Sequence, residues 1–233
     1  MELKFLGRGA AFYPVIGNTS AYFIEDKNLF LIDCGESVFR KLYEKDIFSE
    51  IDNIFVFITH THSDHIGSLP TLILYLSHIY DIKTKIVIPK ENKCLDCIKN
   101  ILNSTGVDDT DYEFINDEDL DNKYSFDNVR YVETTHSDHL TSYSIIFESD
   151  KGVLYYSGDT NELDTVESII HGDKNIDRFY IDTCSKKTDN HIYYEDLFRC
   201  IPKDLRHKCY CMHLDSLDFI EELRENGFNV VEM

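Results

Sequence analysis

Short apolar runs alternate with polar and turn-forming stretches along the chain, a pattern typical of mixed α/β proteins. Residues 54–58 form the clearest run, which is β-branched and aromatic and carries no charge, so it predicts a buried strand. Segments with helical character predict helices at 36–45, 69–76, 91–103, 161–171, 193–201 and 217–226. Further strands are predicted at 3–6, 19–24, 29–33, 85–88, 124, 129–134, 142–147, 153–157, 178–181 and 209–212.

Four residues of metal-ligand type lie within six positions directly after the strand at 54–58, in His60-Thr61-His62-Ser63-Asp64-His65. Side chains two positions apart in an extended segment point the same way, so His60 and His62 can bind one cation together. Asp64 and His65 follow as the chain turns and can reach a second cation. Imidazole and carboxylate suit zinc, with manganese or iron as alternatives. The competing interpretation is a polar loop whose histidines form local hydrogen bonds.

This hexapeptide resembles the HxHxDH signature of the metallo-β-lactamase superfamily. That family adds a third histidine, a bridging aspartate and a final histidine, each at the end of a strand. The chain has matching residues in the expected order, after the strands that end near residues 134, 157 and 212: His136, Asp159 and His213. The resemblance therefore extends over nearly the whole chain and implies an αββα sandwich, with the metals at the shared edge of its two halves.

The resemblance implies a set of ligands for two divalent metal ions, with zinc preferred and manganese possible. His139 competes with His136 for the third position, because both lie in one Thr-His-Ser-Asp-His run, and His136 is preferred because it directly follows the strand. His78, His171 and His207 are expected at the surface or in ordinary packing. One metal would be held by His60, His62 and His136, the other by Asp64, His65 and His213, and Asp159 would bridge them.

The same resemblance suggests two catalytic side chains. Paired cations make hydroxide available at neutral pH, and Asp64 could steer the proton of that nucleophile. His191 is the candidate proton donor for the leaving group. It follows a strand and a loop that look like a shortened form of the paired loop motif of ribonuclease Z, in which Asp182 stands where that family has Glu and could orient His191. The alternative interpretation is that His191 caps the helix that begins near Tyr193.

Several further motifs look like the ribonuclease Z branch of the superfamily. Ribonuclease Z also carries a tRNA-binding exosite arm between the third histidine and the bridging aspartate. Only 23 positions separate His136 from Asp159 here, and a predicted hairpin fills most of them, so we expect no arm. The branch motifs are Leu6-Gly-Arg-Gly-Ala10, Gly17-Asn-Thr-Ser20, Asp33-Cys-Gly-Glu36 and His213-Leu-Asp-Ser216.

Length, composition and charge narrow the class of substrate that the protein could bind. The 233 residues suffice for one α/β domain over 1–233, and no linker divides them. The net charge is −20, much of it in 108–111 and 116–121, which we interpret mainly as solvated loop. The richest basic clusters are Arg206-His-Lys208 and Lys186-Lys187, so we expect no long nucleic acid as partner. Metals would still accept one or two substrate phosphates.

The cellular setting follows from what the chain lacks. The N-terminus shows no basic region followed by a long apolar stretch, and no apolar run approaches a membrane span. Seven cysteines, an odd number without a secretory context, suggest reduced thiols in the cytoplasm of a bacterium or a phage-infected cell. Cys94, Cys97, Cys209 and Cys211 could bind a structural zinc, but buried free thiols are the commoner outcome.

We therefore expect a compact dinuclear-metal phosphodiesterase that hydrolyses a small phosphodiester, in the first place a 3′,5′-cyclic nucleotide, to a nucleoside monophosphate. The chain looks like the compact cyclic-nucleotide phosphodiesterases, which include phage enzymes that destroy the cyclic pyrimidine messengers of the Pycsar defence. That group implies a homodimer, and residues 75–80 could form the dimer face, stack a base or be ordinary half-buried helix. The alternatives are a ribonuclease Z-like RNA endonuclease, a lactonase or thioesterase, and a metal-binding sensor.

Overall fold

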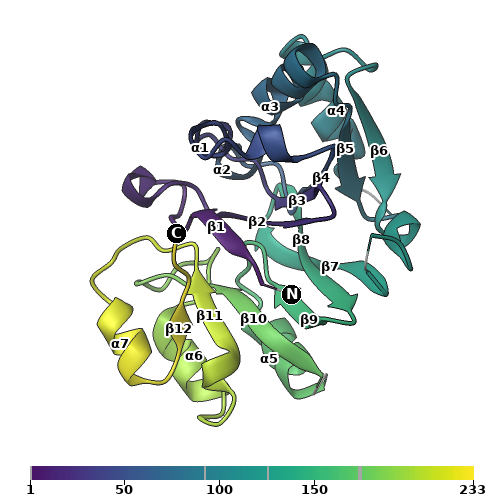
Figure 1. Cartoon of the computed structure of the whole chain (residues 1–233). Coiled ribbons are helices and arrows are strands. Elements are labelled where there is room, and N and C mark those ends of the chain that lie inside the picture. Colours follow the sequence, from purple (N-terminus) through teal and green to yellow (C-terminus); the bar gives the residue numbers. More distant parts are fainter. Residues whose placement is uncertain (1, 92, 125, 173–174) are drawn as a thin grey trace.

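The computed structural model describes residues 2–91, 93–124, 126–172 and 175–233. Two six-stranded sheets face each other, and each carries helices on its outer side (Figure 1). The first sheet has the order β1 (Lys4–Gly7), β2 (Ser20–Glu25), β3 (Asn28–Ile32), β4 (Asn53–Phe57), β5 (Thr84–Ile88) and β6 (Tyr112–Asn116). The second has the order β12 (Asn229–Val230), β11 (Cys209–Met212), β10 (Ile176–Asp182), β9 (Gly152–Tyr156), β8 (Leu140–Ser149) and β7 (Asn128–Ser137).

Each sheet is antiparallel at one side and parallel at the other. Strands β1 to β3 pair antiparallel, whereas β3 to β6 pair parallel. In the second sheet, β7 to β9 are antiparallel and β9 to β12 are parallel. Parallel neighbours end at the same edge of a sheet, so the loops after β4, β9, β10 and β11 are brought toward one edge of the sandwich.

The helices form the two outer layers. Helices α1 (Val38–Glu44), α3 (Leu69–Tyr75) and α4 (Leu95–Ser104) share a buried cluster with the outer face of the first sheet. Helices α5 (Leu163–Gly172), α6 (Tyr194–Cys200) and α7 (Ile220–Glu225) do the same for the second sheet. The short helix α2 (Ser63–Ile66) lies at the candidate site. Among the described residues, no helix is long and apolar enough to cross a membrane.

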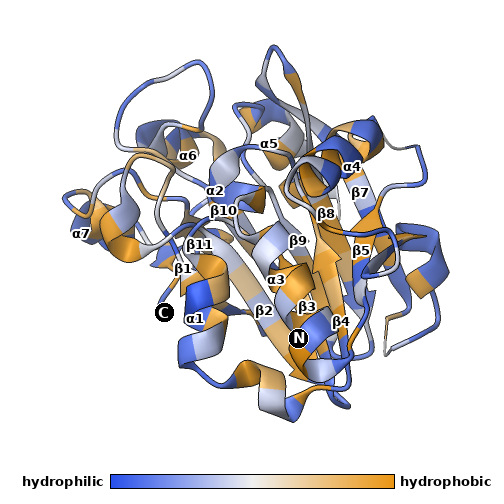
Figure 2. Cartoon of the chain, turned by 90° about the horizontal axis from the view of Figure 1, so that it is seen from above, coloured by the Kyte–Doolittle hydropathy of each residue, from blue (hydrophilic) through white to orange (hydrophobic). Residues whose placement is uncertain are grey.

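A third apolar cluster joins the two sheets. Alternation along β3 sends Leu29 and Leu31 to the helical side and Phe30 and Ile32 to the opposite sheet. Figure 2 shows the hydrophobic strands in the centre, with hydrophilic positions on the outer turns of the helices. The inner layer is rich in aromatic rings, such as Phe57 and Phe147 of the two sheets, whose centroids are 5.0 Å apart. The expected αββα sandwich is therefore confirmed.

The strand predictions were wrong in three places. Strands β6 and β12 were not predicted, and Tyr124 lies in a turn rather than in a strand. Strand β6 lies between the two acidic segments that were interpreted as loop, and Asp117 next to it is buried. Its carboxylate accepts hydrogen bonds from the backbone N–H groups of Lys90, Glu118 and Tyr131, so part of this acidity is structural.

Several helix boundaries also differ from the prediction, and those of α3 and α4 are examples. The helix predicted at 91–103 begins at Leu95, and residue 92 of that range lies outside the described residues. Helix α3 continues into a turn of π-helix, η3 (Leu76–Tyr80), beyond its expected end. Residues 136–159 are all described, and strands β8 and β9 occupy most of them, so no exosite arm extends from this segment.

Candidate metal centre

The predicted ligands come from loops at one edge of both sheets. The hexapeptide His60–His65 directly follows β4 and ends in α2. His136 lies near the end of β7, at an irregularity in its pairing with β8, rather than just after the strand as expected. Asp159 follows β9, and His213 follows β11 with a left-handed backbone, at φ 57°. A non-glycine residue in this conformation is uncommon and is often found at functional sites.

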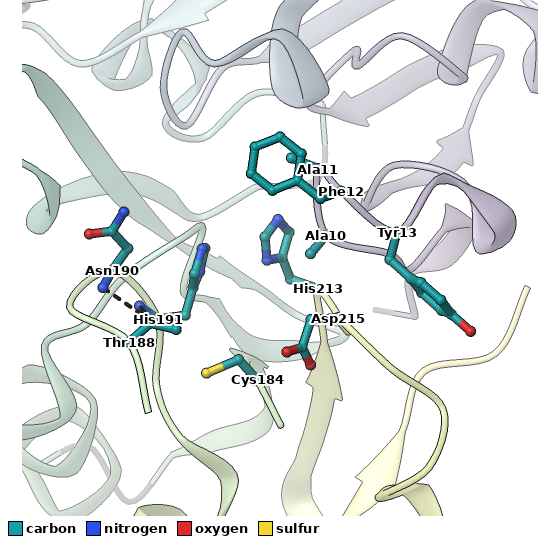
Figure 3. A pocket seen from close by; sticks show the side chains of 10 residues that line it. All are labelled: Ala10, Ala11, Phe12, Tyr13, Cys184, Thr188, Asn190, His191, His213 and Asp215. Atoms are coloured by element: carbon teal, nitrogen blue, oxygen red, sulfur yellow. Dashed lines mark hydrogen bonds between the residues drawn. The ribbon is translucent and has the colours of Figure 1, made fainter. Parts of the chain in front are cut away.

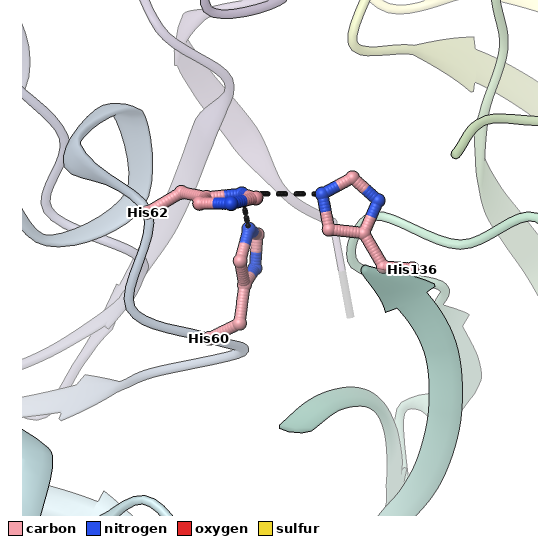
Figure 4. Close-up of side chains that lie close together, drawn as sticks. All are labelled: His60, His62 and His136. Carbon is pink, nitrogen blue, oxygen red and sulfur yellow. Dashed lines mark hydrogen bonds between the residues drawn. The ribbon is translucent and has the colours of Figure 1, made fainter. Parts of the chain in front are cut away.

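Three imidazole nitrogens form the first group (Figure 4). The Nδ1 atom of His62 lies 3.0 Å from Nε2 of His60 and 3.2 Å from Nε2 of His136. Burial, followed by the nearby charge of His65, holds the pKa of His60 well below its usual value, and burial also lowers the pKa of His62. Neutral imidazoles with converging lone pairs are the form that binds a metal ion.

Two carboxylates and two imidazoles form the second group. Nε2 of His65 lies 3.3 Å from Oδ2 of Asp64 and 3.2 Å from Oδ2 of Asp159. Nε2 of His213 lies 3.4 Å and 3.1 Å from the same two oxygens. His65 Nε2 is buried and close to both oxygens, but it makes no well-directed hydrogen bond among the described residues. A buried nitrogen without a partner is costly, and a cation at the centre of this group would satisfy it.

Asp159 connects the two groups. Its Oδ2 atom is within 3.2 Å of the second group's histidine nitrogens and is 3.9 Å from Nε2 of His60 and 3.8 Å from Nε2 of His136. Burial opposes its ionisation, but the positive charges of His213 and His65 hold the pKa of Asp159 well below its usual value. The side chain is therefore an ionised carboxylate placed between two sets of ligands, and the geometry fits a pair of divalent cations.

A second layer of hydrogen bonds orients the histidines. Asp33 Oδ2 lies 2.8 Å from Nδ1 of His65, and the backbone N–H and hydroxyl of Thr59 both donate to the Asp33 carboxylate at 2.8 Å. Nδ1 of His136 lies 2.9 Å from the carbonyl oxygen of Asn190. Such bonds place the proton on Nδ1 and leave Nε2 free to bind a metal. The sequence motif contained Asp33, but its contact with His65 was not predicted.

Asp182 contacts two histidines at once. Its Oδ2 atom lies 2.7 Å from Nδ1 of His191, the predicted interaction, and its Oδ1 atom lies 3.3 Å from Nδ1 of His213, which was not predicted. Burial alone would lower the pKa of His191, but the Asp182 carboxylate raises it above the usual value. The residue at the cap of α6 is Tyr193, so His191 does not serve as the helix cap that was considered as an alternative.

Two adjoining cavities open at this centre. The first, of about 290 Å³, is lined by ligands from both groups together with Phe12, Asn190 and His191. The second, of about 320 Å³, extends past His191 and His213 to Tyr13, Cys184 and Asp215 (Figure 3). Both are small, at the lower end of the range for small-molecule sites. Phe12 and Asn190 were not predicted as site residues, because neither carries a ligand or acid–base signal in the sequence.

The structure thus brings all seven predicted ligands and His191 together. His139 is exposed and lies outside the ligand groups found among the described residues, as do the exposed His78, His171 and His207. No cysteine joins such a group in the described part of the chain, which is contrary to the structural-zinc alternative.

Comparison with known proteins identifies the family. A family model described as anti-Pycsar protein Apyc1 matches residues 1–229. The chain belongs to the Apyc1 family. The resemblance to compact hydrolases of the anti-Pycsar type is therefore confirmed at the level of family.

Curated relatives match over shorter stretches. The anti-Pycsar protein Apyc1 of Bacillus phage BSP38 is 46% identical over 77 residues, which cover 32% of this chain and 29% of the relative. The ribonuclease Z of Methanococcus maripaludis strain C7 is 39% identical over 119 residues, covering 48% of this chain and 36% of that enzyme. The matched stretches thus span about a third of the length of these relatives.

Solved structures share the fold over the whole length. The metallo-β-lactamase fold protein YhfI from Bacillus subtilis superposes with a TM-score of 0.75 at 17% identity, covering 98% of this chain and 94% of YhfI. A diphosphatase from the PhnP family gives a TM-score of 0.71 at 18% identity, covering 99% and 94%. At this identity the similarity shows the fold alone, and it confirms the metallo-β-lactamase architecture of this Apyc1 family member.

Proposed function

We propose that this Apyc1 family member is a dinuclear-metal phosphodiesterase that hydrolyses 3′,5′-cyclic nucleotides to nucleoside monophosphates. The observation that carries the proposal is the pair of ligand groups that share Asp159 at the floor of a cavity of about 290 Å³. This cavity and the adjoining one together suit a small molecule such as a single nucleotide, and the ligands suit the anionic phosphate once cations are bound.

The donor set favours zinc, with manganese as the alternative. Imidazole nitrogens and carboxylate oxygens bind both ions, and the first group consists of nitrogen donors only. His60, His62 and His136 would hold one ion, Asp64, His65 and His213 the other, and Asp159 both. When bound, two such ions supply Lewis-acid activation of water and of the phosphate.

The protein's own side chains then handle the protons. Burial would raise the pKa of Asp64, but the nearby charge of His65 and the hydrogen bond from His213 outweigh it and lower the pKa. It is therefore ionised and can orient the attacking water by accepting a hydrogen bond from it. Hydrolysis forms one P–O bond and breaks another, and the departing sugar oxygen needs a proton. His191, whose pKa is raised, holds one beside the cavity, and Asp182 keeps its ring in place.

Charge and shape support a small substrate over RNA. The net charge of −20 repels a long polyanion, and the segment between His136 and Asp159 carries no arm that could bind tRNA. Relatives of both kinds exist, an anti-Pycsar protein and a ribonuclease Z. Phage enzymes of the anti-Pycsar type destroy cyclic pyrimidine messengers, so we propose the same class of substrate here, in the cytoplasm and with the chain acting as a homodimer.

A substrate panel tests the proposal. Metal-loaded protein is assayed with the four 3′,5′-cyclic nucleotides, 2′,3′-cyclic nucleotides, bis-p-nitrophenyl phosphate, a pre-tRNA and a lactone. We expect metal-dependent turnover of 3′,5′-cyclic nucleotides, loss of it in Asp64→Ala/His65→Ala, and no loss in His207→Ala, whose histidine is exposed and belongs to none of the ligand groups. Cleavage of pre-tRNA or lactone alone would overturn the proposal and favour the corresponding alternative.

A further inference from the structure

Phe12 is placed unusually for a large apolar side chain. It lies on the loop between β1 and the short helix η1 (Pro14–Ile16), and its side chain is 100% exposed. It also lines both cavities of the candidate site. Figure 3 shows it among the side chains that line the second cavity, which include His191 and His213. A fully exposed phenylalanine side chain does not gain the free energy of burial. Its position at the entrance of the two cavities therefore suggests a role in function.

The loop that carries Phe12 is tied to the segment that carries His213. The backbone N–H of Ala10 donates to the carbonyl oxygen of Leu214 at 3.0 Å, and the N–H of Leu214 donates to the carbonyl oxygen of Arg8 at 2.8 Å. The N–H of Tyr13 closes the turn onto the carbonyl oxygen of Ala10 at 3.0 Å. These bonds hold the backbone on both sides of Phe12, so the residue stays at the entrance shared by the two cavities.

The second cavity combines apolar walls with polar groups, several of which already have hydrogen-bond partners. The Asp215 carboxylate there already accepts the N–H and the hydroxyl of Ser185, both at 2.8 Å. The thiol of Cys184 donates to the carbonyl oxygen of Lys186 at 2.9 Å. With these polar atoms engaged, the cavity offers mainly its aromatic and apolar walls. It adjoins the ligand groups through His191 and His213, so one molecule can occupy both cavities.

We propose that Phe12 stacks on the nucleobase of the substrate and holds it over the second cavity, while the phosphate lies at the metal ligands. The inference rests on the proposed function in taking a nucleotide as the substrate. Aromatic side chains stack on any base face, because every base has a π-surface. Phe12 would thus be a binding and positioning residue at the nucleoside end of the site.

Equilibrium binding tests this role independently of turnover. Metal-loaded wild type is titrated calorimetrically with 5′-AMP and with ribose 5-phosphate, which lacks the base. We expect the wild type to bind 5′-AMP about tenfold more tightly than ribose 5-phosphate, Phe12→Ala and Phe12→Leu to lose that preference, and Phe12→Trp to keep it. Val15→Ala is the matched control, because Val15 is 79% exposed in η1, directly after this loop, but lines neither cavity.

Two results would overturn the role of Phe12. One is a preference for 5′-AMP that survives in Phe12→Ala, and the other is an equal loss of affinity for both ligands, which would indicate a damaged phosphate site. Metal content and circular dichroism establish that each variant is folded and loaded. If the base preference depends on Phe12 but no cyclic nucleotide is hydrolysed, the stacking role holds and the proposed reaction alone is wrong.

Discussion

At the scale of single residues, the buried Asp182 connects acid–base chemistry with metal binding. One of its oxygens lies 2.7 Å from His191 Nδ1 and the other 3.3 Å from His213 Nδ1. The backbone N–H of Thr160, next to Asp159, also donates to Asp182, at 3.0 Å. A single carboxylate therefore fixes the ring of the candidate proton donor relative to two of the candidate ligands. Such shared orientation is what a preorganised site requires.

Replacement of His191 should affect substrates according to their leaving group. In His191→Asn, we expect kcat for a cyclic nucleotide to fall about 10²- to 10³-fold, because its alkoxide leaving group needs a proton. The kcat for bis-p-nitrophenyl phosphate should fall much less, because p-nitrophenolate is a good leaving group that needs no proton. The measurement is steady-state kinetics on both substrates, with His207→Asn as the control. Equal losses on both substrates would show that His191 acts on the metal ligands and not as the acid.

The residue scale also shows the limits of sequence reasoning. The seven candidate ligands were predicted because each follows a recognisable strand in a known motif order. The contact between Asp33 and His65 was not predicted, because it joins side chains 32 positions apart through the tertiary fold. The left-handed backbone of Asp33 and His213 was equally hidden, since only packing against neighbouring loops holds non-glycine residues there.

At the scale of elements, strongly apolar strands were predictable and weakly apolar ones were not. Strand β4 is buried over most of its length, so its run of apolar residues identifies it. Strand β6 lies at the edge of its sheet, is only partly buried and is flanked by acidic residues, and β12 has two residues, so neither has a distinctive pattern. A strand that the rest of the fold buries must be apolar, and this apolar run is the feature from which a strand can be predicted.

The loop after β3 packs against the hexapeptide, and this contact requires a glycine at position 35. The N–H of Cys34 donates to the carbonyl oxygen of His65 at 2.7 Å, and a Cβ atom on Gly35 would overlap the backbone carbonyl of Asp64. We expect Gly35→Ala to displace Asp64, to weaken metal binding at least tenfold and to lower the free energy of unfolding by about 1–3 kcal/mol.

Metal titration and urea unfolding measure these effects of Gly35→Ala. Gly172→Ala is a suitable control, because no atom lies within 4 Å of the Cβ it would gain. If Gly35→Ala bound metal as tightly as the wild type does, the proposed contact between the two loops would not position Asp64.

At the scale of the whole molecule, the candidate centre joins the two halves of the sandwich. The hexapeptide belongs to the first sheet, whereas His136, Asp159 and His213 belong to the second. Four buried aspartates meet there, and without cations their mutual repulsion is offset only by hydrogen bonds and histidine charge: Asp33, Asp64, Asp159 and Asp182. Bound divalent ions would neutralise this charge and cross-link the halves, so their contribution should appear in global stability.

Chelation should therefore lower the stability of the molecule as a whole. With metal at 100 to 1,000 times its dissociation constant, binding to the folded state adds about 3–4 kcal/mol, which for a chain of this size corresponds to roughly 5–15 °C in Tm. We expect EDTA to move a single calorimetric transition down by that amount and zinc to restore it. The variant Asp64→Ala/His65→Ala should respond much less to EDTA, because its second ligand group is broken. If EDTA left the Tm of the wild type unchanged, a metal link between the sheets would be contradicted. If a second, separate transition appeared instead, the stabilisation by metal would be confined to the loops around α2.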